Sequence, residues 1–299
     1  MLNYKNEFSG IYVALITPYN SDGSVNYEAI QGLINYQLRG GVSGFFITGT
    51  SSEMLLLSDE ERKKIIAEVV RAVNGRAKVI VQIAGGSTQN AIQMAKYVKS
   101  LNVDGFSAIP PIYFSYKSEQ IIEYYREIAG CIDLPFFVYD YPACTGTNLL
   151  DLQFREIYNI ENCLGLKESS DHHDQMKDLL KDHPRAIIFN GADEHLLTVM
   201  KFGVNAAIGS TYNVIPAPFV EIMQEYKLGN IERAEQLQKE CNELIKILCD
   251  FGGIPAVKHA LKMLGHNVGN CRKPFRILKE EEKVELEKLI KPYLEKYAK

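Results

Sequence analysis

Hydrophobic and polar positions alternate along the first 214 residues in a regular way. Short apolar runs predict buried strands, and longer stretches with apolar positions three or four residues apart predict helices. The predicted strands cover residues 11–16, 44–48, 78–84, 105–109, 135–139, 163–167, 186–189 and 206–208. Strands that alternate with helices imply right-handed crossovers and a parallel sheet. Eight of them predict an α/β fold of the closed (β/α)8 TIM barrel type, with an open doubly wound sheet as the alternative.

The helices between these strands are predicted from the same pattern and from their end signals. They cover residues 26–39, 58–73, 87–101, 119–128, 152–158, 174–181 and 194–202. After residue 214 the alternation stops, and four more helices are predicted at residues 217–228, 231–249, 254–264 and 279–297. We therefore expect a barrel over residues 1–225 and a helical extension over residues 226–299 that packs on it.

Composition narrows the class of protein. The chain has 299 residues, 46% of them hydrophobic, and a formal net charge of −4 without a basic block, which argues against nucleic acid or an anionic membrane as a partner. Apolar runs stay shorter than the ~20 residues of a membrane helix, and the first residues do not resemble a signal peptide. The six cysteines form no C-x-x-C pair, so neither a zinc site nor a disulfide framework is expected. We expect a cytoplasmic protein.

One lysine stands at the end of a predicted strand. Lys167 follows the apolar run that begins at Cys163, and Ser169 and Ser170 come soon after it. In a parallel barrel the carboxyl ends of the strands surround the active site. Burial among apolar neighbours lowers the pKa of a lysine and makes its amine a nucleophile for carbonyl groups. A surface lysine where a strand meets a loop is the alternative interpretation.

Other strand ends carry residues that also suit chemistry. The segment of residues 49–53, Gly-Thr-Ser-Ser-Glu, could hold a carboxylate or form a turn capped by hydroxyls. Tyr139 could move a proton or fill the barrel mouth. Asp193 and Glu194 could bind hydroxyls or start a helix. Tyr113, after two prolines, is typical of a loop tip. A lysine, a tyrosine and an anion-binding loop together suggest imine chemistry on a 2-oxo acid, which needs no metal.

These segments resemble the family of pyruvate-dependent class I aldolases that holds dihydrodipicolinate synthase and N-acetylneuraminate lyase. The resemblance runs from residues 11–18 to residues 271–275, and its shared parts are residues 49–53, Tyr139 and Lys167. The sialate lyase branch fits best, because residues 189–194, 208–213 and 271–275 resemble its segments. The synthase branch has an arginine where this chain has Cys144.

The resemblance implies a role for each matching residue. Lys167 would form the Schiff base that leads to cleavage of N-acetylneuraminate into N-acetylmannosamine and pyruvate, and Tyr139 would shuttle the proton with help from Thr50. Thr50 and Ser51 would hold the carboxylate. Tyr113 would be donated across a subunit interface, which implies a homotetramer; no cofactor is implied. The sugar hydroxyls would be contacted by Ser169, Gly191, Asp193, Glu194 and Ser210.

The chain departs from the family pattern at several positions. Ser52 replaces a usual glycine, so its β-carbon is expected to crowd the site. Ala192 replaces a tyrosine common in the lyases, and Glu168 is more typical of the synthases but should point away from the site. Another pyruvate-dependent aldolase or a dehydratase for a sugar-derived 2-oxo acid is therefore the alternative enzyme, and a non-catalytic sensor of pyruvate or sialate is the alternative of another class.

Overall fold

The strands of the computed structural model, which describes residues 4–150 and 153–298, form a closed barrel. Each strand pairs in parallel with the next, and β8 returns to pair with β1. The closed order confirms the predicted TIM barrel and excludes the open sheet. The strands are β1 Gly10–Ala14, β2 Gly44–Ile47, β3 Lys78–Gln82, β4 Gly105–Ala108, β5 Phe136–Asp140, β6 Cys163–Glu168, β7 Ile187–Asn190 and β8 Ala206–Gly209.

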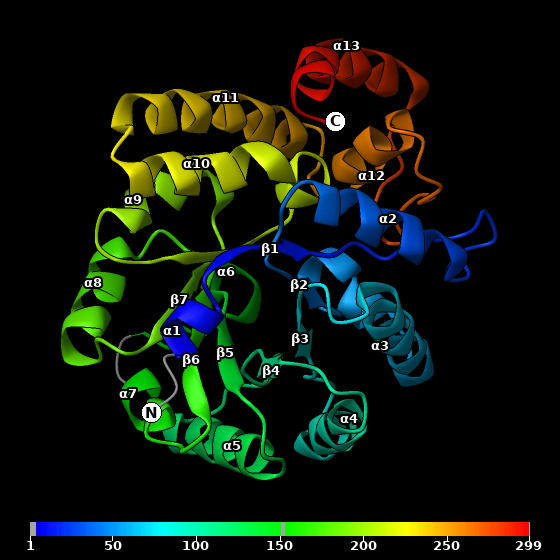
Figure 1. Cartoon of the computed structure of the whole chain (residues 1–299). Helices are drawn as coiled ribbons and strands as arrows, with labels where there is room; N and C mark the ends of the chain where they lie inside the picture. Colours follow the sequence, from blue (N-terminus) through cyan, green and yellow to red (C-terminus); the bar gives the residue numbers. More distant parts are fainter. Residues whose placement is uncertain (1–3, 151–152, 299) are drawn as a thin grey trace.

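Amphipathic helices surround the strands in sequence order (Figure 1). They are α2 Glu28–Arg39, α3 Asp59–Val73, α4 Thr88–Lys99, α5 Ser118–Gly130, α7 Gln153–Tyr158, α8 His173–Asp182, α9 Leu196–Met200 and α10 Pro216–Leu228. A capping box begins α3, because the Ser58 hydroxyl accepts from the Glu61 N–H while the Glu61 carboxylate accepts from the Ser58 N–H. The apolar face of each helix and the outward face of each strand together form a core that is buried on both sides of the barrel wall.

Several short elements were not predicted. A first helix, α1 (Tyr4–Glu7), precedes Phe8, whose ring packs 5.0 Å from that of Phe137 (centroid to centroid). Another, α6 (Pro142–Thr145), follows β5. The helix predicted at residues 194–202 is instead a 3₁₀ turn, η3 (Asp193–His195), followed by α9. The predicted helix start at Leu152 lies outside the described residues.

Further helices follow the barrel and cover one side of it. These are α11 Ile231–Asp250, α12 Ile254–Met263 and α13 Glu280–Tyr297, and α11 lies along α10 (Figure 1). The α11 and α13 surfaces are joined by hydrogen bonds such as that from the Tyr293 hydroxyl to Glu243, 2.8 Å. The expected division between residues 225 and 226 falls within α10, and as a domain boundary it stays a prediction.

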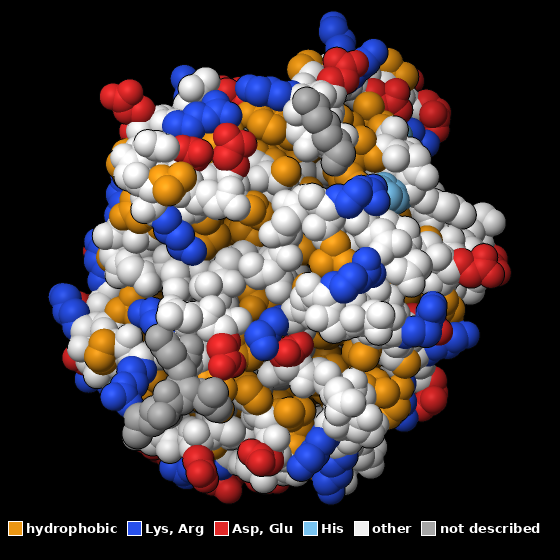
Figure 2. Space-filling view, in the orientation of Figure 1, with side chains coloured by type: hydrophobic (Ala, Val, Ile, Leu, Met, Phe, Trp, Pro, Cys, Tyr) orange, Lys and Arg blue, Asp and Glu red, His pale blue; other side chains and the backbone are white. Residues whose placement is uncertain are grey.

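The charged side chains on the face seen in Figure 2 are of both signs and are interspersed with apolar and neutral ones. Among the described residues, every helix is too short or too polar to pass through a bilayer. All six cysteines are free thiols.

Candidate active site

A cavity of about 600 Å³ lies where the carboxyl ends of the strands meet. Its wall combines loops that follow β2, β5, β6, β7 and β8 with residues of the helices after the barrel. From the predicted set, the structure brings nine residues together here: Thr50, Ser51, Tyr139, Lys167, Ser169, Gly191, Asp193, Glu194 and Ser210. Residues far apart in the sequence therefore share one site, as convergence of parallel strands predicts.

Lys167 is buried at this cavity. It lies beside Tyr139 of β5 and Phe189 of β7 in the barrel register, and only 5% of its surface is exposed. Its Nζ is 4.1 Å from the centroid of the Tyr139 ring and 4.7 Å from that of Phe46. Burial lowers its pKa from 10.5 to about 7, although the nearby Asp193 carboxylate opposes the change. A large fraction of the amine is therefore uncharged at neutral pH, as a nucleophile requires.

Tyr139 presents its hydroxyl to the hydroxyl of Thr50. The two oxygens are 3.1 Å apart, and either can donate the hydrogen bond. Burial raises the pKa of Tyr139 to about 12, while hydrogen bonding to Thr50 and Ser169 opposes the rise. The phenol therefore keeps its proton at neutral pH and can pass it along a hydrogen-bonded pair of hydroxyls.

The segment predicted to bind an anion is a 3₁₀ turn, η1 (Thr50–Ser52), two residues after β2. The expected crowding by Ser52 is wrong, because its hydroxyl donates to the Leu15 carbonyl at 2.5 Å and its own carbonyl accepts from the Thr17 hydroxyl at 2.8 Å. The side chain of Ser52 thus ties the loop to the segment after β1 and leaves the cavity to Thr50 and Ser51.

A buried ion pair holds the far end of this loop. Glu53 has left-handed backbone angles (φ 61°), and its carboxylate accepts from Lys258 Nζ at 2.6 Å and from the Arg272 backbone N–H at 2.8 Å. The Glu53 and Lys258 side chains are 0% and 1% exposed. Because Lys258 belongs to α12, the helical extension contributes directly to the position of η1.

Asp193 closes the opposite side of the cavity. Its carboxylate accepts from the Thr211 N–H at 3.0 Å and from the Thr211 hydroxyl at 2.5 Å. Burial raises its pKa to about 6, and the hydrogen bonds from Thr211 oppose the rise. This close approach needs glycine at position 209, since a β-carbon there would lie 1.9 Å from an Asp193 oxygen.

Tyr113 and Glu168, both considered in the sequence analysis, do not line this cavity. Tyr113 does not reach the cavity of its own chain: it is 94% exposed and lines a separate hollow with its neighbour Phe114. Glu168 lies on the opposite face of β6 from Lys167, where it accepts a hydrogen bond from the Ser170 hydroxyl. This orientation agrees with strand alternation. Burial raises the pKa of Glu168 to about 8.

Some residues beside Lys167 and at the cavity mouth were not predicted from the sequence. Phe46 covers the Lys167 amine, but Phe45 beside it is equally apolar, so alternation gave no signal for which ring faces inward. The helical extension also lines the mouth, through Ile245, Cys249, Gly253 and Ile254. Cys144 lines an adjoining apolar cavity of about 240 Å³ together with Tyr141.

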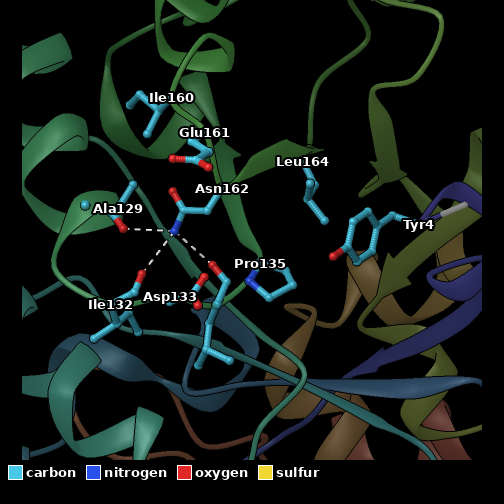
Figure 3. A pocket seen from close by; sticks show the side chains of 11 residues that line it. Tyr4, Ala129, Ile132, Asp133, Pro135, Ile160, Glu161, Asn162 and Leu164 are labelled. Atoms are coloured by element: carbon cyan, nitrogen blue, oxygen red, sulfur yellow. Dashed lines mark hydrogen bonds between the residues drawn. The ribbon is translucent and has the colours of Figure 1, made fainter. Parts of the chain in front are cut away.

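A further cavity, of about 700 Å³, lies near the opposite end of β5 and β6 (Figure 3). The Asn162 side-chain amide points at the carbonyls of Ala129, Ile132 and Leu134 and donates to them at 2.9, 3.2 and 2.9 Å. These hydrogen bonds satisfy the carboxyl end of α5 and the loop after it. Asn162 therefore has a structural role at this end of the barrel.

The chain is similar to known proteins over nearly its whole length. The pattern of the dihydrodipicolinate synthetase family matches residues 7–293. An N-acetylneuraminate lyase of Rhizobium meliloti (strain 1021) is 33% identical over 289 residues, with 96% of each chain covered. N-acetylneuraminate lyase 2 of Escherichia coli O6:H1 is 31% identical over 293 residues, covering 97% of this chain and 96% of that one.

The fold of this chain is also similar to that of solved structures. The Clostridium difficile protein CdNal, in complex with mannosamine, superposes with a TM-score of 0.92 at 29% identity. The superposition covers 95% of this chain and 99% of the other. The barrel and the helices that follow it are thus shared between the two proteins.

Proposed function

The chain belongs to the dihydrodipicolinate synthetase family, and from this premise we propose that it is a class I aldolase, a carbon–carbon lyase that cleaves N-acetylneuraminate into N-acetylmannosamine and pyruvate. The observation that carries the proposal is the buried Lys167 amine beside the Tyr139 and Thr50 hydroxyls. A lysine with a lowered pKa at a cavity has the reactivity that an imine mechanism needs.

The reaction begins at the ketone of the open-chain substrate. The uncharged Lys167 amine attacks C2, and the resulting carbinolamine takes up a proton and loses water to give a protonated imine. The C4 hydroxyl then gives its proton to Tyr139 while the phenol passes its own proton, through Thr50, to the substrate carboxylate. The C3–C4 bond breaks, and the electron pair of this bond moves to the imine as an enamine. N-acetylmannosamine leaves as the aldehyde. Protonation of C3 and hydrolysis of the imine release pyruvate and free Lys167.

The two sides of the cavity then have separate tasks. Thr50 and Ser51, with the backbone N–H groups of η1, would bind the substrate carboxylate and hold C2 near Lys167. Ser169, Gly191, Asp193, Glu194 and Ser210 would contact the sugar hydroxyls. Asp193 is suited to this role because Thr211 fixes its carboxylate in place.

The quaternary structure is part of the proposal. Tyr113 and Phe114 are exposed and their rings are in edge contact, with centroids 5.1 Å apart. An aromatic pair of this kind is typical of a protein interface. We infer that Tyr113 enters the active site of a neighbouring subunit in a homotetramer, and we place the protein in the cytoplasm, where its six free cysteines would stay reduced.

A second enzyme of the same family remains the alternative. Ala192, which lines the cavity, leaves more room on the sugar side than a larger side chain would. This favours a different sugar-derived 2-oxo acid as substrate of an aldolase or dehydratase. A non-catalytic sensor would have no use for a buried nucleophilic amine beside a buried phenol.

The substrate test is a release assay on purified protein. N-acetylneuraminate is supplied, pyruvate is measured with lactate dehydrogenase, and the sugar product is identified by mass spectrometry. We expect equal amounts of pyruvate and N-acetylmannosamine from the wild type and neither from Lys167→Ala. Cleavage of another 2-oxo sugar acid with a kcat/KM at least about a hundredfold higher, roughly 2.7 kcal/mol in transition-state free energy, would instead identify the alternative enzyme.

A further inference from the structure

Three potential metal ligands meet beside the mouth of the cavity. Asp171 lies in the loop after β6, His173 is the first residue of α8, and His195 is the last residue of η3. One ligand atom from each of these side chains lies within 4.8 Å of those of the other two. His195 Nε2 is 3.2 Å from an Asp171 carboxylate oxygen, and the two imidazole rings are 4.7 Å apart between centroids.

The donor atoms have the chemistry of a transition-metal site. Two imidazole nitrogens and one carboxylate oxygen form a ligand set that suits Zn²⁺ and leaves a position for water. Among the described residues, buried His173 Nε2 has no hydrogen-bond partner.

The three ligand atoms lie farther apart than the ligands of a bound zinc ion, and the site can contract around an ion. Ligand atoms at 2.0–2.1 Å from a tetrahedral zinc are roughly 3.3 Å apart, so ligand atoms that lie up to 4.8 Å apart must approach each other by up to about 1.5 Å. The Asp171 oxygen and His195 Nε2 already have nearly this separation, at 3.2 Å, so the approach required is between His173 and this pair, and Asp171, whose side chain is 80% exposed, is free to follow it. His195 lies between Glu194 and α9, and His173 begins α8, so the site closes by rotation of side chains on fixed backbone segments.

We propose that Asp171, His173 and His195 bind a divalent transition-metal cation such as Zn²⁺. The ion joins the loop after β6 to η3, and both segments line the cavity: Asp171 itself lies on the cavity wall, and His195 directly follows Glu194. Bound metal therefore fixes two walls of the sugar side without contacting Lys167. Occupancy of this metal site therefore changes the affinity of the cavity for the sugar part of the substrate, an inference that rests on the proposed function.

The experiment measures metal binding on full-length protein that has been stripped with EDTA and dialysed. ZnCl₂ is titrated by calorimetry into the wild type, Asp171→Asn, His173→Ala and His195→Ala. His183→Ala is the matched control, because His183 lies at the other end of α8. Every variant retains the exposed thiols of Cys144 and Cys249, so zinc bound by cysteine contributes equally to all titrations.

We expect one site per chain that the wild type and His183→Ala share, and an affinity at least about tenfold weaker in each of the three ligand variants. The melting temperature gives a second readout that does not depend on activity, since zinc should raise it only in proteins that keep the site. Equal zinc affinity and equal thermal shifts in the wild type and the ligand variants would overturn the proposal.

Discussion

Replacing Lys167 by methionine should make the protein more stable at neutral pH, although it abolishes imine formation. Methionine fills a similar volume between the Phe46 and Tyr139 rings, but it has no charge to bury. In the wild type, burial holds the pKa of Lys167 at about 7, against 10.5 for an ordinary lysine. The folded state therefore binds the proton more weakly than the unfolded state does, and this difference opposes folding.

The pH dependence follows from the two pKa values. Below pH 7 both states carry the proton, and the full penalty applies; at 1.36 kcal/mol per pKa unit it is at most about 5 kcal/mol. Between pH 7 and pH 10.5 the folded state has lost the proton while the unfolded state still binds it, so the penalty decreases as the pH rises. Its value changes by about 3 kcal/mol between pH 6.5 and pH 9.5.

The assay is urea unfolding of both proteins at pH 6.5 and pH 9.5, followed by circular dichroism. We expect Lys167→Met to have the higher unfolding midpoint at pH 6.5 and to lose most of this advantage at pH 9.5. The control is Lys239→Met, which removes an exposed lysine of α11 and should change neither midpoint. A Lys167→Met variant that is less stable than the wild type at both pH values would refute the conclusion that burial of the charged Lys167 amine destabilises the folded state.

Three other variants test neighbouring parts of the structure. Tyr139→Phe should lower kcat by ~10²–10⁴ in the aldolase assay while pyruvate still forms a trappable imine; normal turnover would exclude the proton shuttle. The contribution of Glu168 to wild-type stability should fall, by up to about 1.4 kcal/mol per pH unit, as the pH rises from 4.5 through 8, because unfolded Glu168 ionises first; urea midpoints should change less steeply with pH in Glu168→Gln than in the wild type over this range, and an unchanged slope would contradict the assignment. Lys258→Met should lower the free energy of unfolding by about 3–5 kcal/mol by leaving Glu53 unpaired in the interior, and adding Glu53→Gln should restore most of it in urea unfolding; a loss below about 1 kcal/mol would show that the ion pair is not buried.

The barrel could be predicted from the sequence because its strands are short apolar runs between amphipathic helices. The family resemblance then identified the residues at the carboxyl ends of the strands, and nine of them do surround one cavity. Short elements were harder to predict. The four-residue α6 and the 3₁₀ turn η3 are too short to show a periodicity, and tertiary contacts such as that between Asp193 and Thr211 decide their geometry.

Parts of the site that depend on long-range packing could not be predicted. The sequence gives no reason for Lys258 to pair with Glu53, because 205 residues separate them and each alone resembles a surface charge. The same limit applies to His195, which meets Asp171 and His173 only because β6 and β7 are neighbours in the barrel. The position of Tyr113 outside the cavity of its own chain likewise follows from the loop before α5.

We expect the amine of Lys167, and no other amine of the protein, to form an imine with pyruvate. The direct measurement is incubation with pyruvate and borohydride at pH 7, followed by digestion and mass spectrometry of every lysine-containing peptide. We expect one modified peptide, carrying the mass of pyruvate less one oxygen atom at Lys167, and no stable adduct in Lys167→Met. An adduct at another lysine, or wild-type labelling in Lys167→Met, would contradict this expectation.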